Sequence, residues 1–163
     1  MEELLRFLCD HNIAFERHDH PAVYTVEEAG RLVPALPAAK TKNLFLRDKK
    51  GAHHFLVVVP AEKRVNIKDL NDRIGSSRLS FGSPERLKKY LGVDPGAVTI
   101  LGIFNDRDHA VDVILDRDLW HETAFQCHPL VNTCTLVIAK DGLAQFLDLM
   151  GHDVKIVDVP GLD

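Results

Sequence analysis

The sequence predicts a single-domain α/β (α+β) protein whose sheet is mixed and mostly antiparallel. Segments with strand character outnumber helical segments, several neighbouring strands are separated by little more than a turn, and helices are interspersed between them. The chain of 163 residues is long enough for one compact domain with a hydrophobic core. No internal repeat, low-complexity tract or linker divides it, so we expect one domain over residues 1–163.

Capping residues and apolar spacing predict the helices. Ser83 followed by Pro84 combines an N-cap with proline at the first helical position, which is typical of a helix start. Thr25 and Glu28 have capping-box spacing, so we expect a helix there that ends before Pro34. The expected helices span residues 2–11, 25–33, 67–74, 84–91 and 143–150.

Two apolar-rich segments around a turn that contains Gly51 predict a β-hairpin. They span residues 40–47 and 54–59, and the turn between them carries charged residues and glycine, as hairpin turns often do. Further strands are expected at residues 13–17, 97–103, 110–115, 123–127, 134–139 and 154–157.

The bulk composition is that of a cytoplasmic protein without membrane segments. No apolar run approaches the roughly 20 residues that a membrane span requires. The N-terminus is acidic and amphipathic, unlike a signal peptide. Three cysteines without CxxC spacing argue against a disulfide framework and for a reducing compartment.

Positive charge is concentrated in the middle of the chain. Residues 31–90 hold 14 Lys and Arg against 5 Asp and Glu, whereas the net charge of the whole chain is −4. Such asymmetry suits a protein that presents one face to a polyanion, although the same charges could also be scattered over the folded surface. The overall acidity argues against indiscriminate duplex binding.

Several well-known catalytic and cofactor motifs are absent. The sequence contains no GxGxxG, GxxxxGK[ST], HExxH or GxSxG pattern, so neither a nucleotide cofactor nor a serine-hydrolase elbow is supported. The pairs His18/His20 and His53/His54 lack further ligands at metal-site spacing. We therefore expect no metal and no cofactor, and a metal-dependent hydrolase remains a minor alternative.

Two segments carry side chains that suit a binding pocket. His128 precedes Pro129, which restricts it to extended backbone at a strand end, and Asn132 follows closely. Cys127 beside His128 resembles a nucleophile and base, but adjacent strand residues point to opposite faces, which favours a buried structural cysteine.

The second segment is the start of the hairpin. Lys40 and Lys42 share one face of an extended strand and Asn43 projects from the other. Ammonium and amide groups suit a phosphate or a carbonyl oxygen. The residues themselves predict an anion-binding pocket or, alternatively, a solvated strand edge.

The chain resembles the YbaK/prolyl-tRNA-synthetase-associated editing domain family along nearly its whole length. The order and spacing of several segments carry this resemblance: Ala39–Asp48, Arg78–Phe81, Ser83–Leu87, Leu91-Gly92, Pro95–Thr99, Val111–Asp116 and His128–Thr133.

The resemblance implies a barrel-like α/β fold and cofactor-free hydrolysis of the ester that joins a wrong amino acid to tRNA(Pro), with alanine expected before cysteine or serine. It implies catalytic roles for Lys42, Asn43 and His128. The segment Phe125–Pro129 departs from the family in lacking a glycine seen in many relatives, which affects the expected pocket shape. Substrate contacts are expected from Lys40, Thr41, Arg78, Pro129 and Asn132.

The partner implied is the acceptor end of tRNA(Pro), with prolyl-tRNA synthetase or an elongation factor as possible docking proteins and a monomer or weak dimer as the oligomeric state. A non-catalytic nucleic-acid-binding module, in which the basic segment matters and the pocket does not, is the alternative from another class.

Overall fold

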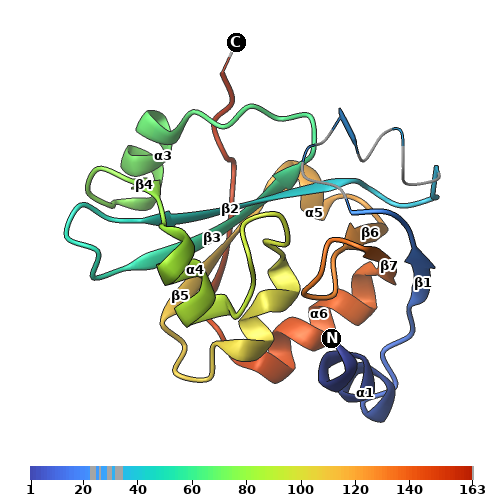
Figure 1. Ribbon diagram of the computed structural model, residues 1–163. Coiled ribbons are helices and arrows are strands. Elements are labelled where there is room, and N and C mark those ends of the chain that lie inside the picture. Colours follow the sequence, from blue (N-terminus) through green and yellow to red (C-terminus); the bar gives the residue numbers. More distant parts are fainter. Residues whose placement is uncertain (23–24, 26, 29–30, 32–34, 163) are drawn as a thin grey trace.

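Two sheets and their surrounding helices make up the computed structural model, which describes residues 1–22, 25, 27–28, 31 and 35–162. The larger sheet has the strand order β4-β2-β3-β5-β8, and the smaller one has the order β1-β7-β6 (Figure 1). The strands span β1 Glu16–Asp19, β2 Thr41–Arg47, β3 His54–Pro60, β4 Ser80–Phe81, β5 Val111–Asp116, β6 Ala124–Cys127, β7 Cys134–Ala139 and β8 Val154–Val157.

The sheets are mixed and mostly antiparallel, as the sequence predicts. β2 pairs antiparallel with β3 from Thr41↔Pro60 to Arg47↔His54, which confirms the hairpin. The pairs β2–β4, β1–β7 and β6–β7 are also antiparallel, whereas β3–β5 and β5–β8 are parallel. A bridge between Ala39 and Phe125 joins the two sheets, which do not close into a barrel within the described residues.

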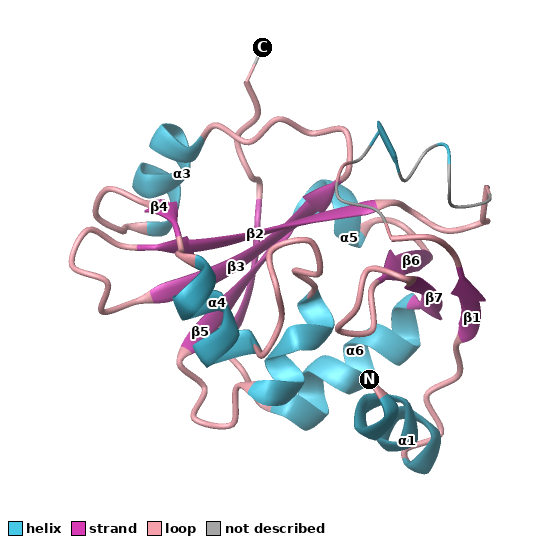
Figure 2. Cartoon of the chain, in the orientation of Figure 1, coloured by secondary structure: helices cyan, strands magenta, loops and turns pink. Residues whose placement is uncertain are grey.

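Helices pack on both sides of the larger sheet (Figure 2), and the helix over Pro84–Leu91 begins at its predicted N-cap. Ser83 Oγ accepts a hydrogen bond from the Arg86 N–H at 3.2 Å, and Gly92 ends that helix in the left-handed conformation at φ 67°. The helices are α1 Glu2–Asp10, α3 Ile67–Ile74, α4 Pro84–Leu91, α5 Arg117–Trp120 and α6 Lys140–Met150, with a 3₁₀ helix η1 at Ile100–Asn105.

The helix expected from Thr25 falls largely outside the described residues. Within them, the Glu28 N–H donates to Thr25 Oγ1 at 3.0 Å, as a capping box requires. No helix in the described part of the chain is long and apolar enough to cross a membrane.

The strand expected at residues 97–103 is wrong, because this segment forms η1. Thr99 Oγ1 caps it by accepting from the Leu101 N–H at 3.2 Å, and Ile100, Leu101 and Ile103 are buried. A short apolar run does not distinguish a strand from a buried helical turn by its periodicity. The strand expected at 13–17 is displaced to Glu16–Asp19, and the short elements β4 and α5 are absent from the prediction.

The two faces of the hairpin belong to different hydrophobic clusters. Phe45 and Val58 pack into the larger cluster, together with α1, α4, α6 and the smaller sheet. Leu46 and Val59 pack into the smaller cluster, which includes Leu70 of α3. Because side chains alternate along a strand, Asn43 lies on the face of the larger cluster and Lys42 on the face of the smaller one.

Candidate active site

The site begins where β2 and β6 run side by side and then separate. The Ala39 N–H donates to Ala124 O, and the Gln126 N–H donates to Ala39 O, both at 2.9 Å, in a short parallel bridge. In a continuing parallel ladder the next bond to Gln126 O would come from the Thr41 N–H. Instead, the Thr41 hydroxyl donates to Gln126 O at 2.7 Å. This bond marks the end of the pairing.

Beyond that bond the two strands form a fork, with Asn43 on one branch and His128 on the other. Each residue lies two positions past the Thr41–Gln126 contact, on β2 and just after β6 respectively. We call this arrangement of Thr41, Asn43, Gln126 and His128 the β2–β6 fork. The contact at the base of the fork joins Thr41 to Gln126, which are 85 positions apart in the sequence.

The fork opens onto an edge of β2 that carries main-chain donors and acceptors. Lys40 O accepts from the Ala61 N–H, and the Asp48 N–H donates to His53 O. The main-chain N–H and C=O groups of the even-numbered residues of β2 therefore point toward β3. The N–H and C=O groups of Thr41 and Asn43 consequently point away from β3. β4 pairs with β2 only at Leu46 and Arg47, which leaves this edge unpaired by β4 near Asn43.

Asn43 presents a buried acceptor at the fork. Its side-chain Oδ1 is buried and has no hydrogen-bond partner among the described residues. A buried acceptor left without a donor costs about 1–3 kcal/mol, so a ligand that supplies an N–H or O–H donor would remove this penalty.

The side chain of Lys42 projects from the opposite face of β2 and reaches the loop after β3. Its ammonium donates to the main-chain oxygen of Lys63, in the loop that follows β3. Burial lowers the pKa of Lys42, and the nearby positive charge of Arg64 lowers it further. Because a lysine ammonium has three protons, two remain for other acceptors after the bond to Lys63.

The imidazole of His128 is held in one tautomer. Its Nδ1 lies 3.2 Å from Cys134 O, and a carbonyl oxygen can only accept, so Nδ1 donates and Nε2 carries the lone pair of the neutral ring. Burial lowers the pKa of His128 and outweighs the opposing effect of its bond to Cys134 O. His128 is therefore a neutral acceptor near pH 7, suited to holding a water molecule or a hydroxyl.

Cys127 is not a competent nucleophile. Its side chain is buried, and burial raises the pKa of the thiol to about 12, so the reactive thiolate is absent near neutral pH. The structure supports the interpretation of Cys127 as a packing residue.

The other predicted contact residues lie at different distances from the fork. Lys40 is exposed at the start of β2, and Pro129 is buried directly after His128. Asn132 lines a cavity of about 190 Å³ together with Gly96, Ala97 and Leu130. Arg78 lies away from the fork. It precedes β4, which pairs with β2 at Leu46 and Arg47. At about 3.3 Å per residue, Arg47 lies roughly 16 Å along the strand from Lys42.

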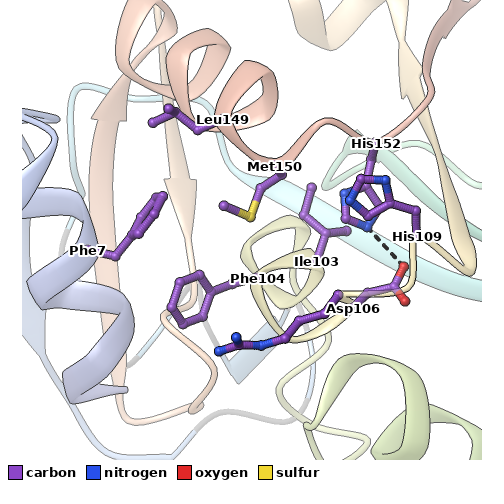
Figure 3. A pocket seen from close by; sticks show the side chains of 9 residues that line it. Phe7, Ile103, Phe104, Asp106, His109, Leu149, Met150 and His152 are labelled. Carbon is purple, nitrogen blue, oxygen red and sulfur yellow. Dashed lines mark hydrogen bonds and ion pairs between the residues drawn. The ribbon is translucent and has the colours of Figure 1, made fainter.

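A larger cavity, of about 460 Å³, lies elsewhere and includes none of the predicted site residues (Figure 3). Phe7, Phe104 and Met150 form apolar walls, and His152 Nε2 bonds Asp106 Oδ2 at 2.9 Å. The residues that the structure describes contain no group of three or more His, Cys, Asp or Glu side chains placed to hold a metal ion.

Two residues whose main-chain oxygens contact the predicted site residues were not singled out as site residues by sequence reasoning. Gln126 fixes the fork through its main chain, and its side-chain Nε2 donates to Ala38 O at 3.0 Å. Lys63 provides the carbonyl that Lys42 contacts. The alternation of β6 could have indicated which way the Gln126 carbonyl points, but no sequence signal identifies Lys63.

Comparison with known proteins shows the family to which this chain belongs. A family model described as the aminoacyl-tRNA editing domain matches residues 20–146. The prolyl-tRNA editing protein ProX of Acetoanaerobium sticklandii is 37% identical over 141 residues, which cover 86% of each chain. The prolyl-tRNA synthetase associated domain-containing protein 1 of Danio rerio is 38% identical over 158 residues, covering 96% of this chain and 85% of that protein.

A solved structure shares the fold. A trans-editing enzyme proposed for prolyl tRNA synthetase superposes with a TM-score of 0.69 at 18% identity, over 98% of this chain and 94% of that chain. These findings confirm the family that the sequence motifs indicate. The chain belongs to the aminoacyl-tRNA editing domain family and is an aminoacyl-tRNA deacylase.

Proposed function

We propose that this protein edits mischarged tRNA(Pro) in trans, hydrolysing the ester of alanyl-tRNA(Pro) in the cytoplasm with residues 1–163 acting as one editing domain. The name of the 37% identical relative, a prolyl-tRNA editing protein, supports the choice of tRNA. The observation that carries the chemistry is the β2–β6 fork, where a buried acceptor on Asn43 and the neutral imidazole of His128 occupy opposite branches.

The fork suits an ester that needs orientation more than activation. An aminoacyl ester is already reactive, so positioning a water molecule and stabilising the developing oxyanion supply most of the required rate. Asn43 fixes the adenosine or the amino acid through its unpartnered oxygen and its main-chain groups at the open edge of β2. The ammonium of Lys42 engages the terminal phosphate or the ester oxygens with its remaining protons.

His128 and the loop that follows it bound the side chain of the amino acid. Pro129 and Asn132 belong to this loop, which makes the pocket small and accounts for admission of alanine and exclusion of proline by size. Discrimination by a missing methylene is worth only about 1–3 kcal/mol, whereas a larger side chain can be rejected sterically. The terminal 2′-hydroxyl of the tRNA assists the attacking water, with Nε2 of His128 as an acceptor nearby.

The macromolecule that this protein binds in the reaction is the acceptor end of tRNA(Pro), whose phosphates Lys40 meets at the exposed start of β2. A-form RNA is contacted mainly through backbone and shape, so only some of the basic residues are needed. Prolyl-tRNA synthetase or an elongation factor would deliver the substrate to a monomer or weak dimer.

The proposal is tested by hydrolysis of a panel of tRNA(Pro) charged with alanine, cysteine, serine or proline. We expect alanyl-tRNA(Pro) to be hydrolysed fastest and prolyl-tRNA(Pro) to survive. Lys42→Ala should lower the rate about 100- to 1,000-fold, the usual effect of removing one group that stabilises developing charge. The exposed turn residue Lys50 offers a matched control, and Lys50→Ala should keep the rate within about twofold, since surface substitutions are usually neutral.

Two outcomes would contradict the proposal. If Lys42→Ala hydrolyses alanyl-tRNA(Pro) at the wild-type rate, the lysine has no role in the reaction. If the protein binds the charged tRNA but hydrolyses no member of the panel, the alternative of a non-catalytic binding module is favoured.

A further inference from the structure

The ammonium of Lys63 lies against three oxygen atoms from other segments of the chain. It contacts Asp116 Oδ2 at 2.7 Å, Asp118 Oδ2 at 2.9 Å and Val159 O at 3.0 Å. Two of the three ammonium protons are donated to Asp118 Oδ2 and Val159 O, and the carboxylate of Asp116 pairs with the same charge. Only 18% of the Lys63 side chain is exposed. Its charge is therefore directed into the protein and not toward solvent.

Asp116 makes this arrangement rigid. Its side chain is fully buried, and a buried carboxylate requires a positive partner close by. Asp116 Oδ1 also accepts from the N–H groups of Asp118 and Val159 at 3.3 and 3.4 Å, which joins the end of β5, the start of α5 and the C-terminal segment. Although burial by itself would lower the pKa of Lys63, the bonds to Asp116 and Asp118 raise it overall, so Lys63 stays charged.

Main-chain bonds hold both flanks of the loop that carries Lys63. The Ala61 N–H donates to Lys40 O at 3.0 Å, next to the start of β2. On the other flank, the Leu162 N–H donates to Arg64 O at 2.7 Å. With the side chain of Lys63 anchored as well, its carbonyl oxygen has a fixed position, and this oxygen accepts the bond from the ammonium of Lys42.

We propose that Lys63 is a positioning residue for the editing reaction: anchored by buried Asp116, it holds the loop carbonyl that orients the ammonium of Lys42. The inference rests on the proposed role of Lys42. It separates Lys63 from the neighbouring basic residues, because its charge is paired with two carboxylates of the protein and only 18% of its side chain is exposed to a phosphate. Lys63 therefore acts on the rate of hydrolysis and not on the affinity for tRNA.

A double-mutant cycle separates this role from a general structural one. Lys63→Met should lower kcat about 10- to 100-fold, the range expected when a reacting group is displaced by about 1 Å, while KM for alanyl-tRNA(Pro) stays within about twofold. In a Lys42→Ala background the same substitution should change the rate less than about twofold, because the group through which Lys63 acts is already gone. Lys155→Met, at an exposed position on β8, controls for the loss of one positive charge.

Asp116→Asn weakens the same ion pair from the side of the carboxylate and preserves the shape of the side chain. It should lower kcat in the same direction as Lys63→Met and again leave KM unchanged. If Lys63→Met does not fold, Asp116→Asn together with the combined Lys63→Met/Asp116→Asn variant, which leaves no unpaired buried charge, decides the question.

A measurement independent of activity completes the test. Reductive methylation followed by peptide mapping reports how freely each lysine reacts. We expect Lys42 to be modified faster in both variants than in the wild type, and Lys155 to be modified at the same rate in all three proteins. Unchanged reactivity of Lys42 overturns the inference even if the protein proves to act on another substrate.

The kinetic outcomes remain distinct from those that test the proposed function. An active wild type with an inactive Lys42→Ala variant and an unaffected Lys63→Met variant refutes the positioning role alone. A raised KM that depends on salt concentration would show that Lys63 contacts tRNA. Equal effects of Lys63→Met with and without Lys42 would show that it acts elsewhere in the fold.

Discussion

The bond between the Thr41 hydroxyl and Gln126 O controls the geometry of the β2–β6 fork, and its removal should impair the reaction more than the fold. Thr41→Val deletes the hydroxyl and keeps a β-branched side chain of similar size. It breaks the 2.7 Å bond at the point where the two strands separate, two residues before Asn43 on one branch and two before His128 on the other.

The magnitude follows from what this bond does. Loss of one neutral hydrogen bond together with an unsatisfied carbonyl costs about 1–3 kcal/mol. For a domain of this size each kcal/mol lowers Tm by roughly 2–4 °C, so the variant should remain folded at assay temperature. The branches of the fork are then free to separate, and a displacement of about 1 Å at a reacting centre can cost about 100-fold in rate.

Single-turnover hydrolysis of alanyl-tRNA(Pro), with the thermal transition of each variant measured in parallel, distinguishes the two effects. Thr41→Val should lower the rate by about 10- to 100-fold, and Thr41→Ser, which keeps the hydroxyl, should restore it to within about threefold. Thr123→Val, at an exposed position before β6, is the matched control. A wild-type rate for Thr41→Val would refute the argument that this bond sets the width of the fork.

Two further predictions concern stability. Burial lowers the pKa of both His54 and His128, so the unfolded chain binds more protons as pH falls below about 6.5, and the free energy of unfolding should decrease there by up to about 1.4 kcal/mol per pH unit for each histidine. Urea unfolding at pH 7.5 and 5.5 tests this; equal or greater stability at pH 5.5 would contradict it. Asp106→Ala removes a buried carboxylate that accepts from His152 and two main-chain N–H groups, and should cost about 1–3 kcal/mol for each buried donor left without an acceptor. Thermal unfolding measures this loss against exposed Asp108→Ala, and equal transitions would contradict it.

Local features of the fold were predictable because their causes are local. The hairpin of β2 and β3 follows from two apolar segments around a glycine-containing turn, and α4 begins at Pro84, directly after its predicted N-cap Ser83. The parallel pairing of β3 with β5 and of β5 with β8 joins segments that are far apart in the sequence. Hydrophobic patterns predicted these three strands but not which strand pairs with which.

The same division applies to the candidate site. Alternation along an extended strand already predicted that Lys42 and Asn43 project from opposite faces, and the structure places them against different hydrophobic clusters. The fork itself depends on Thr41 meeting a carbonyl 85 positions later, and the anchoring of Lys63 depends on residues from β5, α5 and the C-terminal segment. Neither contact leaves a pattern in any one segment.

The structure also shows that some basic residues in the middle of the chain bind acidic segments of the protein itself. By sequence alone, this segment is interpreted as one face presented to a polyanion, with charges scattered over the surface as the alternative. Lys63 is bound by Asp116 and Asp118, and Arg73 Nη1 donates to Asp158 O at 3.1 Å, so two of these cations join the basic segment to the acidic C-terminal half. Part of the charge asymmetry therefore holds the two halves of the chain together. We propose that Lys40 and Lys42, which lie beside the fork, are among the cations that attract the phosphates of the acceptor end. A change at Lys63 should therefore alter the rate and a change at Lys40 the affinity.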